Sequence, residues 1–550
     1  MPTALLPAAA AALLTAIAAI ALPGASLHAA EPGADRPIEE VIDHYIDARL
    51  AEEEVQPAPT AEAAALIRRL TLDLAGRIPT VAEATAFAAS AEDGRVAEAV
   101  ERLLASPDFA WHQRNWLDGL LLADKRSDGK FREYLLEAAR ENRPWDVMFR
   151  EMVSAEDLPE DRQPAAAFLR ERARNVDDMT NDTSQLFFGV SINCAKCHDH
   201  PLVGDWLQDH YYGFASFFDR TYLTKKNTLA EKYSGEVKFK TTAGEEKVAR
   251  LMFLTGAVVE EPAIEKTAEE RKKEDQIVQQ QMKDDKAPAA PKPEFSPRTQ
   301  FVNVSLAEEN NQFFARSIVN RLWARLTGYG LVHPLDQMHS ANPPSHPELM
   351  DWLARDLVSH NYDLKRLIRG IVLSRTYARS AEWTAESDLP GPHLFAVGRT
   401  RPMSPRQYAI SLLIASSSPQ QFPADMPAED WRKKREQLEN AANGFASLIE
   451  RPGENFQVSV DEALLLSNSD RIEREFLRDS GDRLVGYLKT LSEPELRVQE
   501  AFLSIFSRPP AEEELAAMKD YLASRPDRAD AALTQVVWAM LSSPEMRFVP

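Results

Sequence analysis

Cysteine is nearly absent from this sequence, which has two in 550 residues, so the pair forms at most one disulfide or serves a more specialised purpose. Positive charge is also in deficit, because 64 Lys and Arg residues against 85 Asp and Glu residues leave a net charge of −21. A nucleic-acid binder needs a basic face, so this function is disfavoured. Beyond the N-terminus no apolar run is long enough to span a bilayer, and no internal repeat is evident.

What the sequence does contain is enough apolar material for a sizeable core, with 44% hydrophobic and 27% charged residues. The first thirty residues form a separate feature. Ala8 to Leu22 carry no charge, and the small residues up to Ala30 resemble a cleavage site. Residues 1–30 are therefore expected to be a secretory signal peptide, with an uncleaved Ala-rich membrane anchor as the alternative. A signal peptide implies a periplasmic, secreted or cell-surface protein without a transmembrane span in the mature chain.

The remaining patterns predict a mainly α protein of two helical domains, at 31–221 and 301–550, joined by a small β element and a charged linker at 222–300. Alternation of polar and apolar residues at 235–242 indicates the β element. The tract at 260–297 is too polar to be buried and is interpreted as a solvated linker or an exposed helix and loop. Weak periodicity at 419–455 suggests a loop-rich excursion.

The strongest chemical signal is Cys194-Ala195-Lys196-Cys197-His198. Positions i and i+3 of a helical turn share a face, so Cys194 and Cys197 can form thioethers with both vinyl groups on one edge of a haem. His198 then ligates the iron. Export agrees with this interpretation, because c-type haem is attached outside the cytoplasm.

Two other interpretations of the motif stay open. A Cys194–Cys197 disulfide would make a small redox loop, but thioredoxin-like sites belong in a βαβ context and the surroundings here are predicted helical. Zinc could use Cys194, Cys197, His198 and His200 or a remote histidine, although structural zinc usually draws its second ligand pair from a distant segment.

Motifs along most of the mature chain carry a resemblance to a known family. They comprise 69–80, 103–107, 116–118, 142–146, the CxxCH motif with the aromatic residues after it, 311–316, 319–323, 328–332, 344–349, 371–377, 507–510 and 538–545. In these the chain resembles the planctomycete-type, cytochrome-associated proteins that pair the domains of unknown function numbered 1549 and 1553. The resemblance implies a haem-linked exported protein acting beside polysaccharide-degrading and electron-transfer systems. It implies no established reaction.

The ligand on the far side of the iron would decide between electron transfer and catalysis, because two strong axial ligands favour electron transfer and an open face admits substrate. Its identity is unknown. His200 lies too close to His198 in sequence to reach the opposite haem face. The candidates are Met179, His210, Met252 and His339.

Three functional hypotheses follow. The first is an electron-transfer protein that works with a redox partner or with polysaccharide-degradation machinery. The second is a haem- or metal-dependent oxidoreductase or carbohydrate-active enzyme with its site between the domains. The third is a non-catalytic scaffold in which the motif is a disulfide or zinc staple.

Several other polar motifs have structural explanations. Thr80 with Glu83, and Ser345 with Glu348, have the spacing of helix capping boxes. Arg321 is expected to be a paired interior arginine rather than a partner of a haem propionate. Asp73 and Asp118 are expected to cap helices or form ion pairs, not to act as a catalytic pair.

Overall fold

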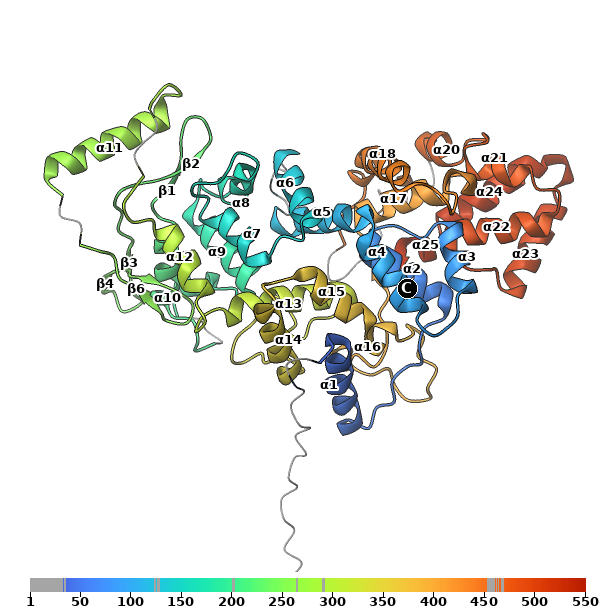
Figure 1. The fold of residues 1–550 in the computed structure, drawn as a ribbon, viewed down its shortest axis with the longest axis horizontal. Helices are drawn as coiled ribbons and strands as arrows, with labels where there is room; N and C mark the ends of the chain where they lie inside the picture. Colours follow the sequence, from blue (N-terminus) through green and yellow to red (C-terminus); the bar gives the residue numbers. More distant parts are fainter. Residues whose placement is uncertain are drawn as a thin grey trace, which may run out of the picture. The chain divides into compact units, whose positions relative to one another are not determined.

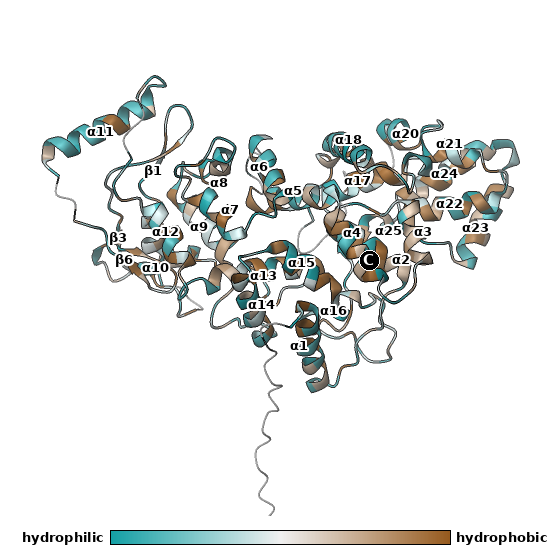
Figure 2. Cartoon of the chain, in the orientation of Figure 1, coloured by the Kyte–Doolittle hydropathy of each residue, from teal (hydrophilic) through white to brown (hydrophobic). Residues whose placement is uncertain are grey.

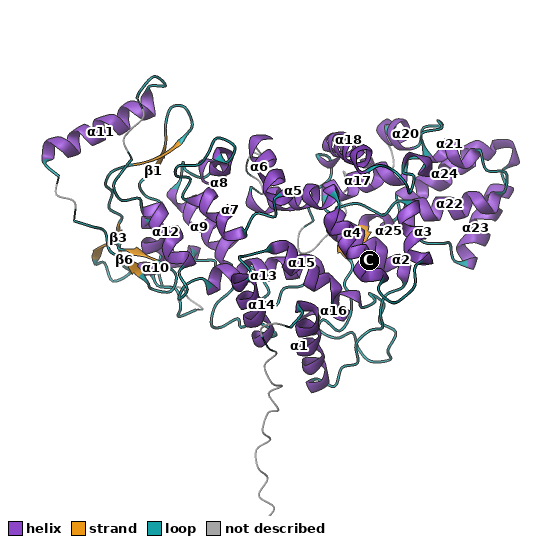
Figure 3. Cartoon of the chain, viewed as in Figure 1, coloured by secondary structure: helices purple, strands orange, loops and turns teal. Residues whose placement is uncertain are grey.

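The structure, a computed structural model, describes residues 33, 36–122, 125, 129–199, 203–263, 266–288, 292–452, 460, 462, 464–465 and 469–550. Helices dominate these residues, and the strands form only short two-stranded sheets (Figure 3). The mainly α prediction is therefore confirmed. The expected signal peptide at 1–30 lies outside the described residues.

The helices before the β segment are α1 (Ile38–Glu52), α2 (Ala63–Ala75), α3 (Val81–Ala89), α4 (Arg95–Ala105), α5 (Pro107–Leu121), α6 (Gly129–Arg140), α7 (Trp145–Val153), η1 (Gln163–Ala166), α8 (Ala167–Arg170), α9 (Val176–Phe188), η2 (Asn193–Lys196) and α10 (Gln208–Ser216), where η marks a 3-10 helix. Most of them precede the CxxCH motif in the chain, whereas η2 contains its beginning and α10 follows it (Figure 1).

The helices after the β segment continue to the end of the chain. They are α11 (Ala268–Lys283), α12 (Pro297–Leu306), α13 (Gln312–Thr327), α14 (Pro347–Ser359), α15 (Leu364–Leu373), α16 (Arg375–Ala378), η3 (Pro392–Leu394), α17 (Pro405–Ala415), η4 (Pro419–Gln421), α18 (Ala428–Ala446), α20 (Asp470–Phe476), α21 (Leu484–Lys489), α22 (Pro494–Phe506), α23 (Glu512–Ala523), η5 (Pro526–Arg528), α24 (Ala529–Leu541) and α25 (Pro544–Arg547).

The strands pair locally except at the end of the chain. Antiparallel pairs join β1 (Thr221–Leu223) to β2 (Leu229–Glu231), β3 (Lys238–Lys240) to β4 (Glu246–Val248), β5 (Leu251–Met252) to β6 (Val258–Val259), and β7 (Arg401–Pro402) to β8 (Phe548–Val549). The first three pairs lie where the sequence predicts a β element. The charged tract that follows contains α11, whose surface is mostly hydrophilic in Figure 2, as an exposed helix should be.

Local signals explain some helix starts and fail at others. The Thr80 hydroxyl accepts a hydrogen bond from Glu83 N, and the Glu83 carboxylate accepts one from Thr80 N, so this capping box is confirmed. The box predicted at Ser345 is wrong, because His346 is the N-cap residue of α14 and the Ser345 hydroxyl bonds its Nδ1. The Pro347 ring starts this helix without a side-chain cap.

The loop-rich excursion predicted at 419–455 is also wrong over much of its length, because α18 occupies Ala428–Ala446. Its apolar face is narrow, and the buried residues include the ion-paired Arg435 and Glu439 beside Leu438, Ala442 and Phe445. Charged residues inside the interface hide the helical period from a hydrophobicity pattern.

Two hydrophobic cores organise the chain from Pro37 onward. The first runs from Ile38 to Ala396, and the second combines residues between Met403 and Val549 with Leu72 and Ile78. Each core thus contains side chains from both predicted helical domains, whose boundaries stay predictions.

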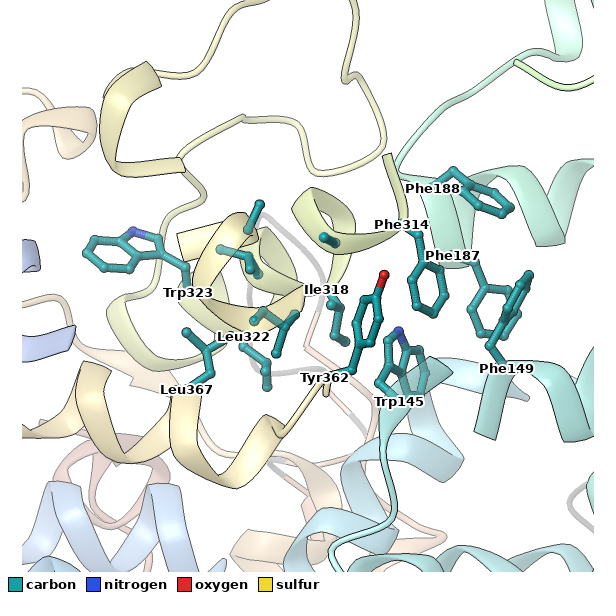
Figure 4. Close-up of a cluster of buried hydrophobic side chains, with 14 of the residues drawn as sticks. Trp145, Phe149, Phe187, Phe188, Phe314, Ile318, Leu322, Trp323, Tyr362 and Leu367 are labelled. Atoms are coloured by element: carbon teal, nitrogen blue, oxygen red, sulfur yellow. The ribbon is translucent and has the colours of Figure 1, made fainter. Parts of the chain in front are cut away.

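A cluster of aromatic residues lies in the first core and fixes the helix that leads to the CxxCH motif (Figure 4). Phe187 and Phe188, at the end of α9, pack against Phe149 of α7 and Phe314 of α13, with ring centroids 4.7 to 6.4 Å apart. Such contacts add to the free energy of apolar burial. They make the C-terminal end of α9 a rigid platform.

None of the helices that the structure describes is long and apolar enough to cross a bilayer.

Candidate functional site

A sharp turn after α9 directs the chain into the CxxCH motif. Gly189 ends the helix in the left-handed conformation, with φ at 66°, and a Cβ there would lie 2.9 Å from Met338 Sδ. Met338 N donates to Gly189 O at 3.0 Å, and Val190 forms a β-bridge with Gln337. Glycine is required here both by the backbone conformation and by the close approach of the segment after α13.

The motif itself begins in the 3-10 helix η2. Three residues complete a turn of such a helix, so the side chains of Cys194 and Cys197 leave it on the same side. Both cysteines are exposed free thiols, whereas Ala195 between them is buried. The turn is tighter than the α-helical turn assumed from the sequence, and a 3-10 turn also brings positions i and i+3 to one side.

Side chains from α9 and α10 hold this turn in place. Lys196 forms an ion pair with Asp177, whose other carboxylate oxygen accepts a hydrogen bond from Tyr211 Oη at 2.6 Å. Tyr212 Oη donates to Lys196 O at 3.0 Å. Burial raises the pKa of Asp177, but the bonds from Lys196 and Tyr211 outweigh it, so the pKa lies below its usual value. The Asp177 carboxylate is thus held in its charged form.

Asp199 connects the end of the motif to α10. Its Oδ1 accepts from Gln208 N, the first residue of that helix, at 3.0 Å. An acidic side chain at this place satisfies an orphan backbone donor and interacts favourably with the helix dipole. The segment from Cys194 to Asp199 is therefore tied at both ends, with its reactive side chains facing outward.

The His198 imidazole is held in a definite tautomer. Its Nδ1 lies 2.7 Å from the carbonyl oxygen of Asp199, and a carbonyl can only accept, so Nδ1 carries the proton. The lone pair is then on Nε2, and His198 is exposed. Metal-ligating histidines commonly make this bond to a carbonyl through the nitrogen that does not bind the metal. The donor set fits a proximal haem ligand beside two thiols.

The two methionines among the predicted axial candidates lie on α9 and β5. Met179 is fully buried in the first core, on α9. Met252 lies on β5 against α10, where a Cβ on Gly213 would come within 2.6 Å of its own Cβ. Met179 therefore takes part in apolar packing, which is the common role of methionine, and Met252 is only partly buried.

The other two candidates lie around Asp205, in the segment between the motif and α10. Asp205 accepts hydrogen bonds from Ser340 N and Oγ at 2.8 and 2.7 Å, which brings the neighbouring His339 to this segment. Burial raises the pKa of Asp205, but the hydrogen bonds from Ser340 and the charges of His339 and His210 outweigh this effect. The pKa of Asp205 therefore lies below its usual value. The tertiary structure thus places both histidines beside one loop.

The two histidines differ in their bonding. His210 Nδ1 accepts from Leu207 N at 3.2 Å, so its proton is on Nε2 and it would have to break this bond to ligate iron. His339 Nδ1 is buried and has no hydrogen-bond partner among the described residues. Ligation by His339 would therefore break no hydrogen bond between its Nδ1 and a described residue, whereas ligation by His210 would.

No group of three or more His, Cys, Asp or Glu residues arranged to hold a metal ion occurs in the part of the chain that the structure describes. His200, named in the zinc alternative, lies outside that part. Zinc therefore stays an alternative prediction.

The remaining polar motifs are ion-paired, as the sequence suggests. Arg321 donates to the Gln185 and Leu186 carbonyls and pairs with Asp336. Asp73 is bonded to Arg401, and Asp118 lies 3.5 Å from Arg132. Sequence reasoning missed Asp177, the anchor of the motif, because nothing local in the sequence marks a residue 17 positions before the first cysteine.

The geometry defines a mainly helical protein with a surface CxxCH turn held between two helices. Residues 41–222 match the family model described as PSCyt2, protein of unknown function (DUF1549), and residues 297–522 match PSD1, protein of unknown function (DUF1553). Together these matches support the two-domain family that the sequence resembles. No curated protein and no solved structure matches the chain.

Proposed function

We propose that this chain is an exported c-type haem protein that passes electrons to or from a partner protein. The observation that carries the proposal is the surface turn on which Cys194 and Cys197 share one side and His198 keeps its Nε2 lone pair. These are the three groups that covalent attachment and proximal ligation of a haem require.

Each residue of the turn has a separate task in this proposal. The Cys194 and Cys197 sulfurs bond the two vinyl groups, and His198 Nε2 ligates the iron. Between the two cysteines, Asp177 holds the side chain of Lys196 and Tyr212 holds its backbone carbonyl, so the thiols keep their spacing. A bound haem supplies a one-electron couple whose potential the axial ligand and burial tune.

Exposure of the motif favours electron transfer over a site closed between domains. Both cysteines and His198 are exposed, so a haem bonded to them would present an edge at the surface. A second protein could approach such an edge directly. In this proposal the partner is a redox protein, and the family resemblance supports a role beside polysaccharide-degradation machinery. Because haem is attached outside the cytoplasm, the proposal includes a periplasmic, secreted or cell-surface location.

The test is expression together with a c-type haem maturation system. The purified protein should keep haem through denaturing electrophoresis and show a pyridine haemochrome spectrum. C194A should leave at most one thioether and shift that spectrum, and H198A should strongly reduce haem incorporation. H393A is the matched control, because His393 is an exposed histidine away from the motif, and its haem content should equal that of the unmodified protein.

Two outcomes would contradict the proposal. One is a protein without covalent haem that contains stoichiometric zinc by elemental analysis, which would support the metal staple. The other is a C194A protein whose spectrum matches the unmodified one, because attachment would then not involve this sulfur.

A further inference from the structure

A cavity of about 760 Å³ lies away from the CxxCH motif, between α5, α17 and α18, which Figure 1 shows together. The end of α13 and the paired strands β7 and β8 complete its wall. Its volume falls within the range of small-molecule sites in proteins. Because α5 comes from the first family match and α13 and α17 from the second, the cavity exists only in the folded two-segment protein.

Arginine dominates the charged groups of this cavity. Four arginines line it, Arg325, Arg401, Arg406 and Arg451, against two acidic residues, Asp73 and Asp118. The whole chain has a net charge of −21, so a positive concave surface is a marked exception. Clefts lined by one sign of charge concentrate ligands of the opposite sign.

The acidic residues of the cavity are already committed to partners. Asp73 accepts two hydrogen bonds from Arg401, at 2.9 and 2.7 Å, and one from Tyr377 Oη at 2.8 Å. The Arg325 guanidinium bonds only neutral acceptors among the described residues, namely Gln113 Oε1 at 3.0 Å and the Asp73 carbonyl at 3.2 Å. Arg325 therefore has no carboxylate of its own within that set.

Negative charge is also scarce among the residues that pack against Arg406 of the cavity lining, because three arginines share one glutamate. Glu439 is the shared partner of Arg114, Arg406 and Arg435, at 2.8, 3.0 and 2.8 Å. The pKa of Arg114 is lowered to about 9, mainly by burial. The charge of Glu439 opposes this shift, and the charge of Arg406 adds to it. Burial likewise lowers the pKa of Arg325 to about 10. The pKa of a guanidinium group is rarely lowered this far, and a bound anion would offset the free-energy cost of burying the positive charge.

Two buried polar atoms at the cavity add an independent sign of a missing ligand. Arg401 Nε and His112 Nε2 are buried without a hydrogen-bond partner among the described residues, and both residues line the cavity. Buried polar groups in native proteins are nearly always paired, with protein, water or ligand.

The neutral part of the lining includes an aromatic ring. Trp116 presents an indole ring that the Arg325 guanidinium covers at 4.8 Å, and the Gln407 amide is already bonded to Ser404 N and Leu72 O. We infer that this cavity binds a small polyanion, whose carboxylate, sulfate or phosphate oxygens pair with Arg325 and Arg406.

Isothermal titration calorimetry on the full mature chain tests the inference with three probes at matched ionic strength: citrate, pyrophosphate and a disulfated disaccharide. At least one should bind with one-to-one stoichiometry, and the tightest identifies the oxyanion. Maltose, which is neutral, should not bind. Haem-free and haem-loaded protein should give the same result, so this test and that of the electron-transfer proposal fail separately.

Three variants decide where the anion binds. R406Q and R325Q should each weaken binding about tenfold or more, and R406K should weaken it less, because it keeps the charge but loses the planar fork. R432Q is the matched control, since Arg432 lies exposed on α18 in a surface pair with Glu429, and it should bind like the unmodified protein. If R406Q or R325Q does not fold, R406K carries the test.

Three results would overturn the inference. The first is the absence of binding by all three anions. The second is an R432Q protein weakened as much as R406Q, which would indicate attraction to surface charge in general. The third is binding unchanged in R406K and R406Q.

Discussion

Replacing Gly189 by alanine tests whether the turn before the CxxCH motif depends on contact with the segment after α13. Gly189 has φ at 66°, and the left-handed conformation costs an alanine about 1–2 kcal/mol. A Cβ would also lie 2.9 Å from Met338 Sδ and 3.3 Å from the Leu335 carbonyl oxygen. Crowding of this kind in a packed site adds about 1–2 kcal/mol. The expected total loss is about 2–4 kcal/mol.

Gly94 provides the matched control. Its φ is 85°, but nothing lies within 4 Å of a Cβ built there, so G94A bears the conformational cost alone, about 1–2 kcal/mol. Denaturant unfolding followed by tryptophan fluorescence gives both values. The difference between G189A and G94A, about 1–2 kcal/mol, measures the contact.

A double-mutant cycle assigns the contact to its partner. Met338 is buried, so M338A alone should be destabilising, but in the G189A background it should cost about 1 kcal/mol less, because the crowding is relieved. Equal midpoints for G189A and G94A, or strict additivity with M338A, would refute this account of the turn.

Three further predictions concern stability. Burial lowers the pKa of His346 from 6.5 to about 4, so the folded protein keeps the neutral imidazole while the unfolded chain takes up a proton below pH 6.5. The stability that the neutral His346 contributes is complete above pH 6.5 and is lost as the pH falls towards 4. In urea titrations, the unmodified protein should lose about 2 kcal/mol more than H346N between pH 7 and pH 5. Arg77 lowers the pKa of Glu83 to about 2 against the opposing effect of burial, so E83Q should lower the free energy of unfolding by about 3 kcal/mol at pH 7. The difference in unfolding free energy between E83Q and the unmodified protein should shrink only below about pH 4.5. F314A should cost about 3–5 kcal/mol in thermal or denaturant unfolding, because its ring fills the centre of the aromatic cluster; a loss below 1 kcal/mol would contradict the packing seen in Figure 4.

Periodicity and capping residues predicted helical structure on both sides of a short β segment, because these signals depend on neighbours within a few positions. The capping box at Thr80 and Glu83 is of this kind. Prediction failed at α18, whose interior holds Arg435 and Glu439. Their burial depends on Arg114 and Arg406, which come from other helices, and no local pattern announces such partners.

Some features of the candidate site likewise follow from local sequence, and others depend on the tertiary structure. The i, i+3 spacing of Cys194 and Cys197 predicts that both thiols share a face, and the structure has both of them exposed. The axial candidates could not be ranked from sequence, because only the fold buries Met179 in the first core and brings His339 to Asp205.

The sequence by itself determined the mainly α class, the CxxCH turn and its possible chemistry, since all three follow from residue type and spacing within a few positions. Only the tertiary structure decided that the turn faces outward, that Asp177 anchors it, and that four arginines from distant segments line one cavity. The reason is physical: burial, hydrogen-bond partners and local charge balance are set by which segments pack together, and that choice is made by the whole chain at once.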